Sequence, residues 1–153
     1  MYSKILVPLD GSHTAQRGLQ EAIRLAKELK TPGQLRLLHV IDDFPILMEM
    51  STVVSFDKSM QALREFARQM LDKAKAVALA SDVEAQISLR EVTKGRIADA
   101  VIAEARESGC DLIVMGTHGR RGFGRLALGS DADMVVRASP IPVLLVRHAP
   151  DAE

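Results

Sequence analysis

The residues best suited to chemistry lie in a glycine-rich segment in the last third of the chain. Four glycines fall within positions 116–124, and Gly129-Ser130 follow shortly after them. Glycine lets backbone N–H groups turn toward a ligand, and the free N–H groups at the start of a helix attract anions. The pattern therefore indicates a phosphate-bearing ligand. The same glycines are also typical of an ordinary turn, in which Ser130 would cap a helix with help from Asp133.

Positive charge is concentrated in this segment. Arg120, Arg121 and Arg125 lie in it, and no acidic residue occurs between Asp111 and Asp131, although 20 Lys and Arg balance 20 Asp and Glu in the whole chain. We expect the arginines to screen a small anion, and at least one of them to be simply solvated. A net charge of zero argues against a surface built for polyanions, so we predict neither nucleic acid nor a membrane as a partner.

Other kinds of site are poorly represented in the sequence. There is no Gly-Lys-Ser/Thr of a Walker loop, no Gly-x-Ser-x-Gly elbow and no His-Glu-x-x-His zinc motif. The single cysteine, Cys110, excludes a disulfide within the chain and is predicted to be a buried, inert thiol. Of the four histidines, we expect only His118 to approach a ligand. Asp10 is the only candidate catalytic carboxylate.

Short apolar runs alternate with segments of helical periodicity, which predicts strands alternating with helices around a parallel sheet. The chain is expected to form one domain over residues 1–150, with a short tail at 151–153. Continuous apolar runs place the first and fourth strands centrally, and alternation places the third at an edge. The last strand is either central or an apolar edge that invites pairing with another chain. The predicted strands lie near 3–9, 34–41, 84–92, 111–116 and 142–147.

Helices are predicted between these strands. Their apolar stripes run over about 15–29, about 58–80, from after Gly95 to Gly109, and from Ser130 to before Pro140. The segment 42–57 is apolar without clear periodicity and is interrupted by Pro45, so we predict an irregular flap. It would pack over the second helix or a dimer interface, cover a ligand, or bind a partner. No signal peptide or membrane stretch is recognised, so we expect a cytoplasmic protein.

Gly116-x-x-Gly119, followed after nine residues by Gly129-Ser130, resembles the nucleotide-binding signature of the universal stress protein family, in its ATP-binding subgroup. The likeness extends to residues 5–12, 38–40, 111–115 and 142–147. It implies a Rossmann-like, doubly wound parallel sheet of five strands in the order 3-2-1-4-5, with helices on both faces, as in the adenine nucleotide alpha hydrolase-like fold. It also implies ATP held between strands one and four, and a homodimer joined through strand 142–147.

The resemblance further implies which residues contact the ligand. Asp10 would lie near the ribose and phosphates or their Mg²⁺, and Val40 would bond adenine through its backbone. With one tyrosine and no tryptophan in the chain, aliphatic walls rather than stacking are expected around the base. The expected ligand-binding residues are Pro8, Asp10, Val40, Met115, Gly116, His118, Gly119, Arg120, Gly129, Ser130, Asp131 and Ala132, with Asp10 also the expected Mg²⁺ ligand.

One feature departs from the family pattern. The family commonly has a small or apolar residue after Gly-Ser, whereas this helix opens with Ser130-Asp131-Ala132-Asp133. Acids in a first helical turn complement the helix dipole, which is the simple explanation. If either carboxylate points into the pocket instead, it repels a triphosphate or obliges Mg²⁺ to bridge.

The sequence is compatible with three functions. The leading hypothesis is a nucleotide-binding module in stress response or regulation, because no base, lysine or metal cluster accompanies the phosphate loop. The alternative is a slow ATPase or autophosphorylating enzyme that uses Asp10 and Mg²⁺. A purely structural dimer with an empty pocket is the third.

Overall fold

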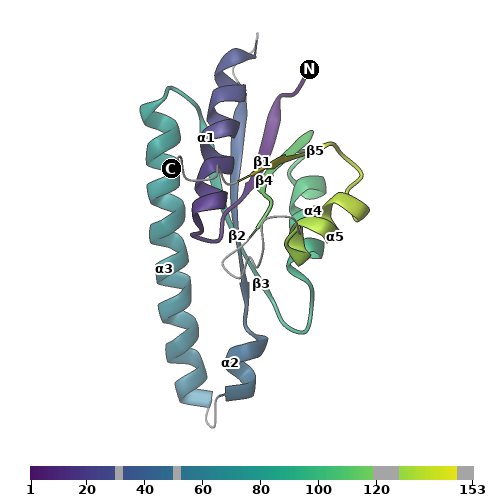
Figure 1. The fold of residues 1–153 in the computed structure, drawn as a ribbon. Helices are drawn as coiled ribbons and strands as arrows, with labels where there is room; N and C mark the ends of the chain where they lie inside the picture. The colour runs from purple at the N-terminus through teal and green to yellow at the C-terminus, as the bar shows by residue number, and fades with distance from the viewer. Residues whose placement is uncertain (30–32, 50–52, 119–127, 148–153) are drawn as a thin grey trace, which may run out of the picture.

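A five-stranded parallel sheet forms the centre of the molecule (Figure 1). The computed structural model describes residues 1–29, 33–49, 53–118 and 128–147. The strands are β1 (Lys4–Pro8), β2 (Gln34–Asp42), β3 (Ala85–Val92), β4 (Leu112–Gly116) and β5 (Val143–Val146). They are ordered β3-β2-β1-β4-β5, and every neighbouring pair is parallel. The predicted topology is confirmed.

Helices cover both faces of this sheet. One face packs against α1 (His13–Glu28) and α3 (Val53–Ala80), and the other against α4 (Ile97–Glu107) and α5 (Ser130–Ala138). The doubly wound arrangement is therefore confirmed as well. Within the described ranges, no helix is both long and apolar enough to cross a membrane.

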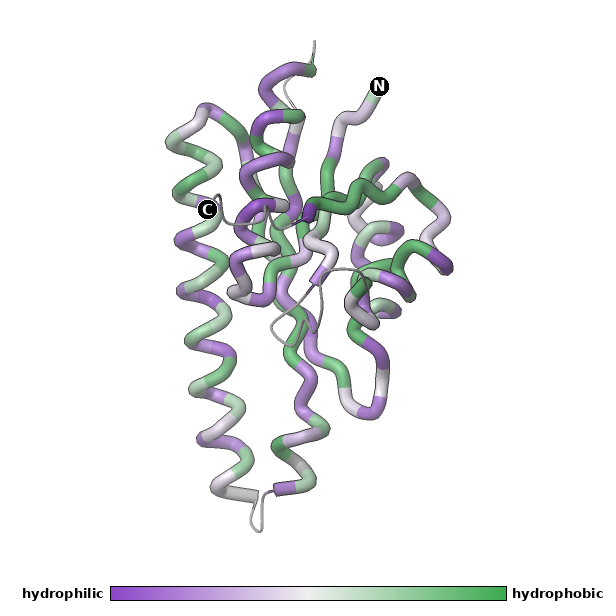
Figure 2. Tube along the Cα trace, viewed as in Figure 1, coloured by the Kyte–Doolittle hydropathy of each residue, from purple (hydrophilic) through white to green (hydrophobic). Residues whose placement is uncertain are grey.

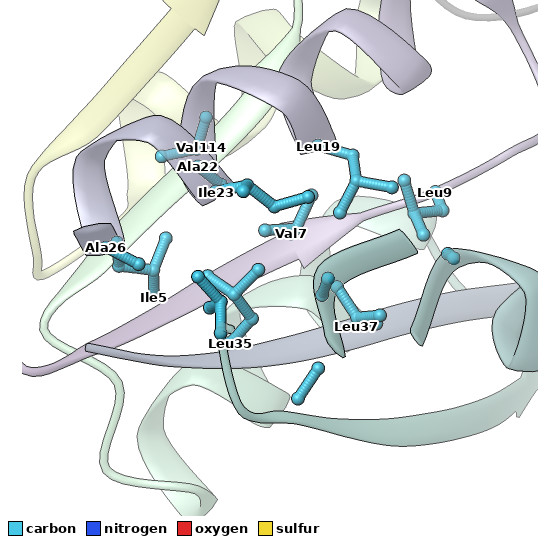
Figure 3. Packing of buried hydrophobic residues seen from close by; sticks show 14 of the residues in the cluster. Ile5, Val7, Leu9, Leu19, Ala22, Ile23, Ala26, Leu35, Leu37 and Val114 are labelled. Atoms are coloured by element: carbon cyan, nitrogen blue, oxygen red, sulfur yellow. The ribbon is translucent and has the colours of Figure 1, made fainter. Parts of the chain in front are cut away.

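The apolar runs of the central strands reflect burial on both faces. Ile5 and Val7 of β1 point into the cluster formed with α1, whereas Leu6 between them points toward α4 and α5. None of these three side chains is exposed to solvent. Figure 3 shows the first cluster, in which side chains of α1 such as Ile23 lie over β1 and its neighbours. Each large side chain buried this way stabilises the fold by roughly 1.5–3 kcal/mol.

The two edges of the sheet differ in character. β3 is one edge, as its alternating sequence predicts, and β5 is the other. This position decides between the two alternatives that the sequence leaves open for the last strand. β5 is hydrophobic along its whole length (Figure 2), and Leu144 is 36% exposed. An apolar edge with free backbone groups is thus presented on one side of the sheet.

The prediction of an irregular flap over 42–57 is wrong for most of that segment. Residues Phe44–Glu49 form the short helix α2, and α3 already begins at Val53. Pro45 does not break α2, because it lies in the first turn, where a helix makes no use of the missing N–H. The Oδ1 atom of Asp42 accepts a hydrogen bond of 3.1 Å from the Phe44 N–H and so supports the start of α2. Ile46 and Phe56 pack against buried Met60.

Cys110 lies two residues before β4, near the end of this strand that is opposite to Gly116. Its side chain is buried, and this burial raises the pKa of the thiol to about 11. A thiol with so high a pKa is a poor nucleophile at neutral pH. The prediction of a buried, inert thiol is confirmed. Gly109, just before it, has a φ of +67° and follows the end of α4, as expected.

A buried ion cluster fastens α4 to two strands. The Glu104 side chain on α4 is only 3% exposed and accepts a hydrogen bond of 2.7 Å from Arg36 Nε on β2. Arg90 on β3 also donates to Glu104, and Ser108 Oγ donates at 2.8 Å. Burial by itself would raise the pKa of Glu104, but these hydrogen bonds outweigh it and lower the pKa to about 2. Nothing in the sequence pattern marks this carboxylate, since its two arginine partners lie on strands that only the fold brings to α4.

We expect Glu104→Gln to destabilise the protein by about 3 kcal/mol at pH 7, because the two arginines lose a buried counter-ion. The folded pKa of Glu104 lies below its value in the unfolded chain, so this contribution is complete above about pH 4.3 and lost as pH falls toward 2. Urea unfolding at a series of pH values measures the difference between variant and wild type. Glu107→Gln is the control: Glu107 also binds Arg90, but it is 65% exposed and should cost under about 1 kcal/mol. A Glu104→Gln variant as stable as the control would contradict this account.

Candidate functional site

A cavity of about 520 Å³ opens at the carboxyl ends of β1 and β4. The two strands are neighbours in the sheet, yet the chain continues from β1 into α1 on one face and from β4 toward α5 on the other. Ligands of doubly wound sheets bind at such a reversal. Ten expected ligand-binding residues line this cavity: Pro8, Asp10, Val40, Met115, Gly116, His118, Gly129, Ser130, Asp131 and Ala132. The other two, Gly119 and Arg120, lie outside the described residues, as do Arg121 and Arg125.

Backbone hydrogen bonds bring the two ends of the glycine-rich segment together. The Gly129 N–H donates to the Thr117 carbonyl at 2.7 Å, and the Thr117 N–H donates to the Val146 carbonyl of β5 at 3.0 Å. Thr117 is almost completely buried. As a result, His118 and Ser130, twelve positions apart in sequence, face one cavity.

The helix α5 starts at Ser130, as predicted, but it differs from the alternative in which Ser130 is the cap. Gly129, not Ser130, is the N-cap, and no side chain caps the helix; Ser130 is the first helical residue. A glycine cap leaves the N–H groups of the first turn available to a ligand rather than to a serine hydroxyl. Since Gly129, Ser130 and Ala132 all line the cavity, this helix end is directed at its contents.

Asp10 is held in place by the turn that follows β1. Its Oδ1 atom accepts a hydrogen bond of 2.9 Å from the Ser12 N–H, and Gly11 between them has a φ of +81°. The Ser12 hydroxyl in turn accepts from the Ala15 N–H at 3.1 Å and caps α1. The turn thus orients the Asp10 carboxylate at the cavity before any ligand arrives.

Two histidines line the cavity, where the sequence predicted only His118. His39 was missed; its Nδ1 lies 2.6 Å from the Leu9 carbonyl oxygen. Because a carbonyl only accepts, His39 Nδ1 carries a proton and donates this bond. The signal available in the sequence was a histidine between the apolar residues Leu38 and Val40. His118 Nδ1 lies 2.9 Å from Thr117 Oγ1, and its Nε2 is buried with no hydrogen-bond partner among the described residues.

Aliphatic side chains form one wall of the cavity. They come from β2, β4 and α4, and none of the described lining residues is Phe, Tyr or Trp. The members are Leu38, Val40, Ile97, Val101 and Met115. Such a wall suits a flat heterocycle, which would then be recognised by backbone groups and shape rather than by stacking.

Carboxylates, not cations, dominate the charge of the described lining. Asp131 faces the cavity together with Asp10 and Asp42, and no described lining residue is a lysine or an arginine. Burial, followed by the charges of Asp10 and Asp42, raises the pKa of Asp131. Asp133 is different, because both of its oxygens accept from Arg137 Nε, at 3.0 and 3.1 Å. Among the described residues, no group of three or more His, Cys, Asp or Glu side chains is arranged to hold a metal by itself.

A doubly wound parallel sheet with a ligand-sized cavity at its reversal defines the Rossmann-like class of α/β binding domains. Within this class the chain belongs to the universal stress protein family, whose sequence profile matches residues 1–147.

The chain is similar to several members of known sequence or structure. Universal stress protein MJ0531 of Methanocaldococcus jannaschii is 31% identical over 147 residues, which cover 96% of this chain and 83% of the relative. The solved structure of MJ0577, from the same organism, has a TM-score of 0.86 and 26% identity, with 99% of both chains covered. A universal stress protein solved in complex with cAMP has a TM-score of 0.62 and 28% identity, with 95% of this chain and 97% of that chain covered.

Gly116 has a structural role beside its place in the cavity. A Cβ added there would lie 2.7 Å from Thr14 Cγ2 and 2.9 Å from the Thr14 carbonyl carbon, so α1 packs directly on the end of β4. On the helix side, Gly18 faces the Gly116 backbone. The absence of a side chain at Gly116 therefore serves helix packing, a reason that the sequence pattern does not reveal.

Gly116→Ala should destabilise the protein by about 1–3 kcal/mol, because both the Thr14 side chain and its backbone must shift. Urea unfolding followed by circular dichroism measures the change. Gly95→Ala is the matched control, since a Cβ there meets nothing closer than Val92 Cβ at 3.6 Å. It should change stability by less than about 0.5 kcal/mol. Equal unfolding midpoints for the two variants would be incompatible with close packing of α1 on Gly116.

Proposed function

We propose that this universal stress protein binds ATP with Mg²⁺ in the cavity between β1 and β4, and that it acts as a regulatory module rather than as an efficient enzyme. One observation carries the proposal. Ten residues expected to contact the nucleotide come from four separate segments and line one cavity. Its volume of about 520 Å³ falls in the range of small-molecule sites.

Two parts of the cavity lining suit the two parts of a nucleotide. Adenine would lie against the aliphatic wall and accept or donate hydrogen bonds at the backbone of Val40. The phosphates would lie at the start of α5, where free N–H groups and the helix dipole favour anions. Asp10 would hold Mg²⁺ on the phosphates, since carboxylate oxygens are preferred ligands of this ion. The relative that was solved with cAMP supports an adenine ligand.

A regulatory role is supported by what the described part of the lining lacks for phosphoryl transfer; Arg120, which we also expect at the ligand, lies outside that part. Such enzymes use a lysine or arginine on the phosphates and a base near the nucleophile. The described lining has neither cation, and the carboxylates of Asp10 and Asp42 each accept a hydrogen bond from a backbone N–H. These groups favour holding a nucleotide over cleaving it.

The purified protein should release an adenine nucleotide when it is denatured, and chromatography identifies the released compound. Fresh ATP with Mg²⁺ should then bind in calorimetry and remain uncleaved over hours. Asp10→Asn keeps an oxygen for the Ser12 N–H but removes the charge, so it should reduce the gain in ATP affinity that Mg²⁺ provides, by about tenfold.

Two results would contradict this function. No released nucleotide and no thermal shift with ATP or AMP would favour a structural protein with an empty pocket. Steady ATP turnover that disappears in Asp10→Asn would establish the enzyme alternative.

We also propose a homodimer joined through β5. The edge position of this strand and its exposed Leu144 leave an apolar surface with free backbone groups. Pairing of two such edges would bury it.

Leu144→Lys should convert the dimer to a monomer, because it places a charge in the apolar edge. Multi-angle light scattering gives the mass directly. Leu79→Lys on α3 is the control, since Leu79 is also exposed, at 50%, but lies far from β5 in the fold. A Leu144→Lys protein with the mass of a dimer would rule out this interface.

A further inference from the structure

Asp131 lies at the point where a phosphate would bind. It is the second residue of α5, and it lines the cavity together with its neighbours Ser130 and Ala132. The positive end of a helix dipole and the first-turn N–H groups attract any anion within reach. The Asp131 carboxylate is a built-in anion at this place, and it competes with a phosphate for the same helix end.

The described surroundings of Asp131 are acidic. Asp10 from the end of β1 and Asp42 from the end of β2 face the same cavity, and their charges contribute to the raised pKa of Asp131. Among the residues that the structure describes, no cation forms an ion pair with Asp131. A ligand that enters the cavity therefore meets carboxylates from three segments of the chain.

Asp133 shows that this arrangement is particular to Asp131. The two acids occupy the first turn of α5, and both carboxylates interact favourably with the positive end of the helix dipole. Asp133, however, is paired with Arg137, is 43% exposed and does not line the cavity. Helix stabilisation explains Asp133, but it leaves the cavity-facing position of Asp131 unexplained.

We propose that Asp131 makes the cavity select adenine ligands by the net charge of their phosphates. The inference rests on the proposed function, because it concerns the same cavity. Repulsion between the carboxylate and the ligand increases with each phosphate charge. It is smallest for a cyclic monophosphate, larger for AMP and largest for metal-free ATP.

Magnesium weakens this repulsion. Bound to a triphosphate, the ion cancels part of the phosphate charge and accepts oxygen ligands from carboxylates. Asp131 then faces a cation instead of an uncompensated anion. The cavity thus admits ATP as its Mg²⁺ complex and discriminates against free ATP, whereas monophosphates bind without a metal.

Calorimetry with cAMP, AMP and ATP, each in EDTA and in Mg²⁺, tests this selection on the full chain after exhaustive dialysis. A pH of 8 lies far above the usual range of an aspartate side chain, so Asp131 is charged. In EDTA, wild type should bind ATP at least about tenfold more weakly than AMP. Asp131→Asn should bring the two affinities close together, and Asp133→Asn should leave the wild-type ratio unchanged.

The measured quantity is a ratio of affinities within one variant, so a small loss of folded protein does not affect it. Asp131→Val removes the same charge without an amide and should give the same ratio as Asp131→Asn. An ATP-to-AMP ratio in both Asp131 variants equal to that of wild type would overturn the proposed selection, although nucleotide binding itself would stand. If wild type binds no adenine ligand in either buffer, the proposed function fails and this inference fails with it.

Discussion

Parallel strands cannot be joined by tight turns, and this constraint determines where the cavity lies. Each strand must be followed by a crossover that returns over one face of the sheet. The chain leaves β1 toward α1 and leaves β4 toward α5, which lie on opposite faces. Because β1 and β4 are adjacent, their ends separate and leave a space between them. Asp10, the ends of the glycine-rich segment and the start of α5 meet there for this reason alone.

Much of this arrangement was predictable from the sequence, because a strand that is buried on both faces consists of a continuous run of apolar residues. Continuous apolar runs correctly placed β1 and β4 at the centre, and alternation in β3 correctly placed it at an edge. The strand order came from the resemblance carried by Gly116-x-x-Gly119 and Gly129-Ser130. Ten expected ligand-binding residues face one cavity, since residues that follow parallel strands gather at the same edge of the sheet.

The features that sequence reasoning missed depend on contacts between distant parts of the chain. The helix α2 forms across Pro45, with support from Asp42 and from packing around Met60, where local periodicity gave no sign of a helix. His39 is oriented by the carbonyl of Leu9, which follows β1. Glu104 is ionised in the interior because two arginines from different strands reach it. A pattern read along one segment cannot show a partner that only the fold supplies.

The bond between the Gly129 N–H and the Thr117 carbonyl bears on how this domain can diversify. It holds Thr117 and Gly129, the residues on either side of the intervening segment, next to each other between the end of β4 and the start of α5. The length and sequence of that segment can then change at a small entropic cost, while β4, β5 and α5 keep their places. Changes confined to the sequence between these two anchors would therefore leave the frame of the cavity in place.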